Sequence, residues 1–292
     1  MGLDDTSSKD EQEAIDGEEN EVSEEEGDRA REAMRLMPSY PFPADFRLEY
    51  DGGPGIEVIS HICRRHPKGT RVVALFCPGV HGGVGPCRNP GNNFDENALY
   101  ATVARRLMES EGTSVDCYRC SWPFMRPRMG CAIGGVCRVL HHGLQEAIRG
   151  SDADREVRVV FIGHSLGGAV VTHAAQAVAR HFRDDGAGGQ DMAGFERAWI
   201  RMAGIITLNA AVDTRDFEEA HGLENLSSCR ALLVSGDADQ VVPPDSTAAL
   251  HEALPTPHKR HLHLEGGTHD LYAHKEQLVE ELVQFISDCQ DV

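Results

Sequence analysis

The sequence is short of basic side chains and has no long uninterrupted apolar run. Its 28 Lys and Arg residues are outnumbered by 47 Asp and Glu residues, which gives a net charge of −19. No basic face is apparent to offset phosphate repulsion, so the composition argues against partners such as nucleic acid or an anionic membrane surface. We also expect no membrane span and no signal peptide, because the first residues are polar and acidic.

A disulfide framework is also missing. The nine cysteines are odd in number and have no framework spacing, which favours a reducing compartment and predicts a cytoplasmic protein. Cys117 and Cys120 have the spacing of a CxxC pair, but they lie in a predicted strand, where residues three apart point to opposite faces. A redox or metal-binding role is therefore not expected for them.

The acidic charge is concentrated in the first part of the chain. Residues 1–33 hold 14 Asp and Glu against 3 Lys and Arg, and they contain too few apolar residues to offset the entropy lost on ordering. We predict a disordered acidic tail over 1–33 and a single ordered domain over 34–292.

Within the ordered part, predicted strands and helices alternate. A turn-rich segment at 51–55 separates two short apolar runs, which predicts an antiparallel hairpin of Phe46–Tyr50 and Ile56–Ile62. The alternation that follows predicts an α/β fold with a mostly parallel central sheet and helices on both faces. Further strands are expected at Val72–Cys77, Ser114–Trp122, 157–162, Ile200–Leu208, Ala231–Val234 and His261–Leu264, and helices at Asn97–Glu109, Cys131–Arg149, 168–179, Asp245–Ala253 and Glu276–Ser287.

The most informative stretch is 157–172, which reads VRVVFIGHSLGGAVVT. A buried strand runs into Gly163-His-Ser165-Leu-Gly167, and a helix follows, which is the context of a nucleophile elbow. Ser165 is therefore the candidate nucleophile. Gly163 and Gly167 leave space where a Cβ would collide with the neighbouring chain.

Two later loops supply partners for a serine nucleophile. After one predicted strand comes 235–243, which contains Asp237 and Asp239, and after the last predicted strand comes 265–270, which contains His269. Both loops follow the carboxyl ends of parallel strands, where open α/β sheets build their sites. The order Ser, Asp, His is also the usual order for this elbow.

Together the segments GHSLGG, GDADQVVP and GGTH resemble the nucleophile, acid and histidine motifs of the α/β-hydrolase superfamily, over nearly everything from about residue 46 onward. The resemblance implies an α/β-hydrolase fold with a minimal cap, with Ser165 as nucleophile and His269 as general base and acid. It implies Asp239 as the residue that orients His269. The Gly-x-x-Asp spacing favours Asp239 over Asp237, and Asp213 is the alternative acid.

The resemblance also implies an oxyanion hole made of two backbone N–H groups. One is expected from Leu166, and the other from the loop after the Val72–Cys77 strand. Val80 is favoured because Pro78-Gly79 directly ends that strand, whereas a shifted alignment nominates Gly83. The Trp122–Met129 segment either lines a pocket wall or caps the sheet.

The remaining histidines suggest no second site. His164 is expected to be a packing residue. His261 and His263 share one face of a strand, a spacing compatible with metal, but no Cys or carboxylate partner is evident. We therefore expect no metal and no cofactor.

Two functions of different classes fit the sequence. The first is a serine hydrolase that cleaves an ester, thioester or related acyl bond of a small-molecule substrate through an acyl-enzyme. The alternative is a non-catalytic interaction protein that keeps the fold and uses the acidic tail to contact a partner. The sequence predicts no oligomeric state.

Overall fold

The computed structural model describes residues 44–49, 55–63, 70–82, 98–123, 126–149, 156–182, 199–212 and 223–291. The predicted acidic tail, the alternative oxyanion donor Gly83 and the alternative acid Asp213 all lie outside these residues. Among the described helices, none is long and apolar enough to cross a membrane.

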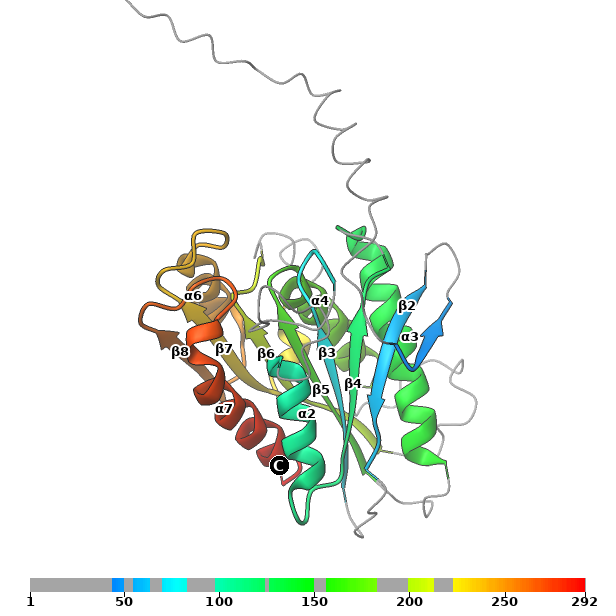
Figure 1. Cartoon of the computed structure of the whole chain (residues 1–292). Coiled ribbons are helices and arrows are strands. Elements are labelled where there is room, and N and C mark those ends of the chain that lie inside the picture. The colour runs from blue at the N-terminus through cyan, green and yellow to red at the C-terminus, as the bar shows by residue number, and fades with distance from the viewer. Residues whose placement is uncertain are drawn as a thin grey trace, which may run out of the picture.

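Eight strands form one twisted sheet in the order β1-β2-β4-β3-β5-β6-β7-β8 (Figure 1). Pairs β1–β2 and β2–β4 are antiparallel, whereas every pair from β4 through β8 is parallel. The predicted mostly parallel sheet and its N-terminal hairpin are thus confirmed. The strands are β1 (Phe46–Leu48), β2 (Ile56–His61), β3 (Arg71–Cys77), β4 (Val115–Ser121), β5 (Glu156–His164), β6 (Trp199–Leu208), β7 (Arg230–Gly236) and β8 (Lys259–Leu264).

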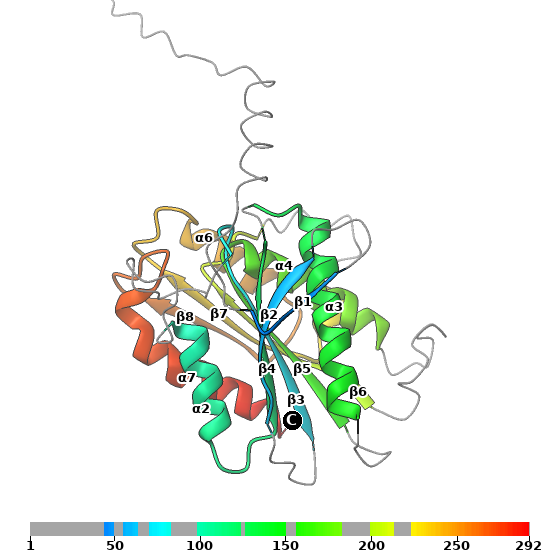
Figure 2. The same ribbon diagram turned by 45° about the vertical axis from the view of Figure 1, so that its right-hand side comes forward.

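Helices cover both faces of the sheet, as the alternation predicted. Figure 2 shows α2 and α7 on one side and α3 and α4 on the other. The bounds are α2 (Leu99–Glu109), α3 (Met129–Ile148), α4 (Leu166–His181), α6 (Pro244–Ala253) and α7 (Lys275–Asp288), with 3-10 turns at Glu224–Leu226 and Tyr272–His274. Helix α3 begins two residues before the predicted start, so that Met129 and Gly130 belong to its first turn.

The sheet separates two apolar cores because strand residues alternate between its faces. Leu75 and Phe161 belong to the core under α3 and α4, whereas their neighbours Phe76 and Ile162 belong to the core under α2 and α7. The central strands are buried on both faces, which explains their continuous apolar runs. This layer positions the described residues that directly follow the carboxyl ends of the parallel strands.

Candidate active site

Ser165 lies in the tight connection between β5 and α4. Its backbone adopts φ 54° and ψ −122°, a left-handed conformation that side-chain-bearing residues rarely take. The backbone N–H of Ser165 donates to the carbonyl of Leu208 at the end of β6, at 2.9 Å. The strained turn therefore holds Ser165 at the carboxyl edge of the sheet, directly before the N-terminus of α4.

The glycines around Ser165 are required by close backbone contacts. A Cβ on Gly163 would overlap the carbonyl group of Gly167, and a Cβ on Gly167 would overlap the carbonyl oxygens of Cys77 and Pro78. Strand β5, helix α4 and the end of β3 consequently approach one another more closely than any larger residue permits. This packing explains the Gly-x-Ser-x-Gly spacing in physical terms.

Asp239 and His269, which follow β7 and β8, form a hydrogen-bonded pair. Nδ1 of His269 lies 2.8 Å from Oδ2 of Asp239, and Oδ1 of Asp239 accepts the backbone N–H groups of Val241 and Val242 at 2.8 and 3.0 Å. The side chain of Asp239 is fully buried. Because a carboxylate only accepts hydrogen bonds, Nδ1 of a neutral His269 carries the proton and Nε2 is left as the basic nitrogen.

The relation between Ser165 and His269 is less direct. Among the described residues, the structure records no hydrogen bond between the Ser165 hydroxyl and His269. The two residues are linked through His164, whose ring lies 4.8 Å from that of His269 between ring centroids. Catalytic hydrogen bonds are often long in a protein without substrate and shorten in the complex, so this geometry is compatible with a nucleophile and its base.

Two backbone N–H groups belong to segments that contact or adjoin Ser165. In the described part of the chain, neither Val80 nor Leu166 donates its backbone N–H to a recorded partner. The Val80 N–H belongs to a turn closed by the Gly82 N–H and the Gly79 carbonyl, at 3.1 Å. Trp122 Nε1 also donates to the Gly79 carbonyl, at 2.9 Å, which ties this turn to the loop after β4.

Strained backbone conformations gather at the same edge. Among the described residues, four non-glycine residues have positive φ: Arg126 (50°), Ser165 (54°), Asn209 (44°) and Leu271 (56°). They follow β4, β5, β6 and β8, and all four therefore lie in loops at the carboxyl ends of parallel strands. Such conformations cost free energy and tend to persist at functional sites.

Comparisons with known proteins support the fold. No family model matches the chain, and no curated protein matches its sequence. Solved structures do match. Est1E from Butyrivibrio proteoclasticus, solved with ferulic acid bound, has 13% identity and a TM-score of 0.55 over 84% of this chain and 99% of that chain. A putative alpha/beta hydrolase of unknown function from Agrobacterium tumefaciens has 15% identity and a TM-score of 0.50 over 82% of this chain and 94% of that chain. A puromycin-hydrolyzing peptidase from Mycobacterium tuberculosis has 16% identity and a TM-score of 0.52, and the match covers 84% of this chain but 39% of that chain.

This chain has the α/β-hydrolase fold. The predicted fold class is therefore confirmed by the sheet order and by these matches together. At such low identities the likeness concerns the fold alone, so the activity has to be argued from the side chains at the edge of the sheet.

Within this α/β-hydrolase fold, Asp237 has a different environment from Asp239. Its Oδ1 accepts the backbone N–H of Gly266 at 2.6 Å, and its Oδ2 lies 3.9 Å from Nε2 of His263. It is partly exposed and has no recorded contact with His269. The position of Asp237 makes it a support for the turn before His269, whereas Asp239 contacts the imidazole itself.

The two histidines on β8, His261 and His263, belong to no metal-binding group among the described residues. His261 and His263 both lie near the Ser235 hydroxyl, at 2.8 and 3.4 Å. Over the described ranges, no group of three or more His, Cys, Asp or Glu side chains is arranged to hold a metal ion.

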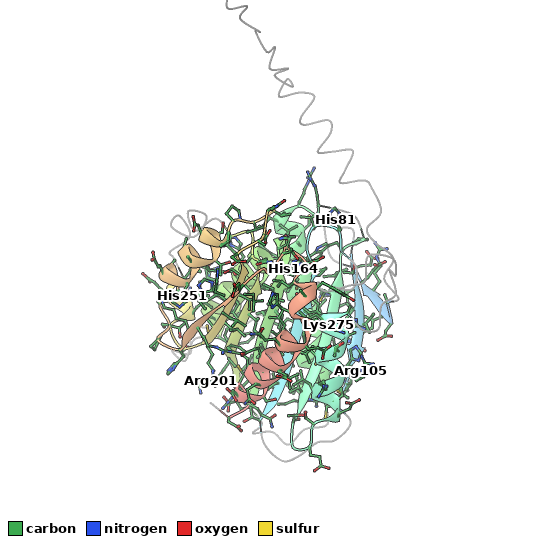
Figure 3. All side chains as sticks on the ribbon, turned by 60° about the vertical axis from the view of Figure 1, so that its left-hand side comes forward. His81, Arg105, His164, Arg201, His251 and Lys275 are labelled. Atoms are coloured by element: carbon green, nitrogen blue, oxygen red, sulfur yellow. The ribbon has the colours of Figure 1, made fainter. Side chains whose placement is uncertain are left out.

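Two residues contribute more than the sequence indicated. Asn209, which follows β6, was not singled out from the sequence, and His164 was expected only to pack. Figure 3 shows His164 toward the end of the sheet that carries His81, away from Arg105 and Arg201. Both Asn209 and His164 bind the backbone of His269. An Asn directly after a predicted parallel strand was the available signal, since Asn tolerates the left-handed conformation.

Proposed function

We propose that this protein is a serine hydrolase that cleaves an ester, thioester or related acyl bond of a small-molecule substrate. Ser165 is the nucleophile, His269 is the general base and acid, and Asp239 orients His269. The oxyanion of the tetrahedral intermediate is bound by the backbone N–H groups of Val80 and Leu166. The reaction requires no metal and no cofactor.

One observation carries the proposal. The buried carboxylate of Asp239 lies 2.8 Å from Nδ1 of His269. The backbone carbonyl of His269 is in turn hydrogen-bonded to His164, which directly precedes Ser165 and its positive φ. A buried carboxylate would be costly without partners, and this one accepts three hydrogen bonds. The arrangement supports a basic Nε2 held at the edge of the sheet beside Ser165.

The steps follow from these positions. Nε2 of His269 accepts the Ser165 hydroxyl proton as Oγ bonds to the substrate carbonyl carbon, and the carbonyl oxygen becomes an oxyanion. His269 then protonates the leaving group, the bond to that group breaks, and an acyl-serine remains. Water, deprotonated by the same Nε2, attacks the acyl-serine and releases the acid together with free Ser165.

The N-terminus of α4 favours the first step. Its dipole places partial positive charge at Leu166, directly after the nucleophile, where the oxyanion forms. Ser165 is nearly buried, so the interaction acts in a medium of low polarity, where it is stronger than in water.

The proposal is tested with an active-site-directed reagent. We expect a fluorophosphonate probe to label the wild-type protein at Ser165 and to leave Ser165→Ala unlabelled. We also expect the wild-type protein to hydrolyse short p-nitrophenyl esters, and Ser165→Ala and His269→Gln to lose that activity. Absence of labelling in the folded wild-type protein, or equal ester hydrolysis by Ser165→Ala, would overturn the proposal. A panel of acyl chain lengths on the same protein then defines the substrate class.

A further inference from the structure

Asn209 occupies an unusual position at the carboxyl edge of the sheet. It directly follows β6, it is 2% exposed, and its φ of 44° is left-handed. Its backbone N–H donates to the carbonyl of Val234 on β7, at 2.9 Å. A polar side chain is therefore held in the interior, in a conformation that few residue types tolerate.

The side-chain amide of Asn209 joins two other loops. Nδ2 donates to the carbonyls of Thr268 and His269, at 2.9 and 3.2 Å. Oδ1 accepts the backbone N–H of Gly236 at 2.9 Å. Gly236 ends the strand that precedes Asp239, and Thr268 precedes His269. One amide thus bridges the segments that carry the two members of the Asp–His pair.

His164, at the end of β5, also binds the backbone carbonyl of His269 that Asn209 contacts. Its Nε2 lies 2.7 Å from the carbonyl oxygen of His269. A carbonyl only accepts, so Nε2 of His164 carries the proton and donates it. Burial, together with the nearby His269, lowers the pKa of His164 to about 4, so the ring is neutral near pH 7.

The neutral state of the His164 ring matters because the ring lies next to the imidazole of His269. The two imidazole rings lie 4.8 Å apart between centroids, and His269 becomes positively charged when it accepts the Ser165 proton. A charged His164 would repel the His269 imidazolium. With a neutral His164, the negative charge of Asp239 balances the positive charge of His269. The other ring nitrogen of His164, Nδ1, faces Gly79. A Cβ built on Gly79 would lie 3.4 Å from this nitrogen.

We infer that Asn209 and His164 are positioning residues, which fix the imidazole of His269 by holding its main-chain carbonyl from two strands. The inference rests on the proposed function and goes beyond its three catalytic residues. A displacement of about 1 Å at a reacting group can cost about 100-fold in rate. The loop after β8 carries the general base, and these two side chains tie that loop to β5, β6 and β7.

Two His164 variants of similar size separate this hydrogen bond from simple packing. His164→Leu removes the donor, whereas His164→Gln keeps an amide N–H at about the distance of Nε2. Asn209→Gly removes the bridging amide and tolerates the positive φ. His181→Leu, the same chemical change at the far end of α4, is the matched control.

The first measurement is p-nitrophenyl acetate hydrolysis by the full chain. We expect kcat to fall about 10- to 100-fold in His164→Leu and in Asn209→Gly, with KM within about threefold of wild type. We expect His164→Gln to recover most of the loss and His181→Leu to match wild type. Should Asn209→Gly fail to fold, the Leu and Gln variants of His164 carry the test.

The second measurement needs no turnover, so it separates failure of this inference from failure of the proposed function. The Nδ1 proton of His269, held by Asp239, is observed by proton NMR and assigned with His269→Gln. We expect a sharp resonance in wild type and an exchange-broadened one in His164→Leu and Asn209→Gly. The inference would be overturned if folded His164→Leu kept the wild-type kcat or a sharp Nδ1 resonance. It would also be overturned if the Leu and Gln variants of His164 lost equal activity, or if the variants changed only KM.

Discussion

Asp239 and His269 face each other across two loops, with Oδ2 of Asp239 2.8 Å from Nδ1 of His269. The other carboxylate oxygen is held by the backbone N–H groups of Val241 and Val242. The carboxylate therefore cannot turn away from the imidazole without losing both of these bonds. It selects the tautomer in which Nε2 is free to act as a base.

The first prediction concerns this pair. Asp239→Asn keeps the shape of the side chain, but it removes the negative charge that balances the His269 imidazolium. We expect kcat to fall by about 10³- to 10⁴-fold with little change in KM, measured on p-nitrophenyl acetate. Asp237→Asn is the matched control, because it removes the same charge two residues away and keeps the acceptor for the Gly266 N–H. Equal losses in the two variants would contradict the assignment of Asp239.

The second prediction concerns the N–H of Val80. Gly79–Gly82 form a turn in which Val80 occupies the second position, where proline is well tolerated. Val80→Pro removes the proposed oxyanion donor, and Val80→Ala keeps it. We expect Val80→Pro to lose about 10²- to 10³-fold in kcat, about 3 kcal/mol of transition-state stabilisation, and Val80→Ala to lose little. A Val80→Pro enzyme that is folded and as active as Val80→Ala would assign the donor to another residue.

The third prediction concerns the elbow glycines and stability. A Cβ at Gly163 would overlap the backbone of Gly167, and backbone atoms of both β5 and α4 would have to move. We expect Gly163→Ala to lower the free energy of unfolding by about 3 kcal/mol or more, measured by urea denaturation. Gly130→Ala is the control, because no atom lies within 4 Å of the added methyl group. Alanine is a better helix former, so that control should be neutral or stabilising by up to about 1 kcal/mol.

The sequence predicted those parts of the molecule that depend on local patterns. Continuous apolar runs predicted the central strands, because a parallel strand covered on both faces needs apolar residues throughout. The connection from β5 through Ser165 to α4 was predictable because strand, turn and helix are contiguous in the chain. The loops with Asp239 and His269 were predictable because each directly follows a strand.

Contacts between distant segments could not be predicted in the same way. Asn209 binds residues 59 and 60 positions away, and His164 binds a carbonyl 105 positions away. Both contacts depend on how the β6 end and the loop after β8 meet across the sheet, which no local pattern encodes. No local pattern around His164 favours a hydrogen-bonded imidazole over one that only packs.

The fourth prediction concerns the pH dependence of stability. His164 is buried, and this burial, with the nearby charge of His269, lowers its pKa from 6.5 to about 4. Between these values the unfolded chain binds a proton at this residue and the folded protein does not. Stability from this group is therefore fully present above about pH 6.5 and decreases as the pH falls toward 4.

The expected size of this effect follows from the shift. A pKa lowered from 6.5 to about 4 corresponds to about 3 kcal/mol of unfolding free energy, which is lost as the pH falls over that interval. His61, whose pKa burial also lowers to about 4, adds to the same trend. We expect urea denaturation of wild type to show a steep loss of stability from pH 6.5 to 4. His164→Gln cannot titrate there, so its stability should depend less steeply on pH. Identical pH slopes for the two proteins would show that His164 is accessible to protons in the folded state, and the neutral hydrogen-bonded ring assigned to it would then be wrong.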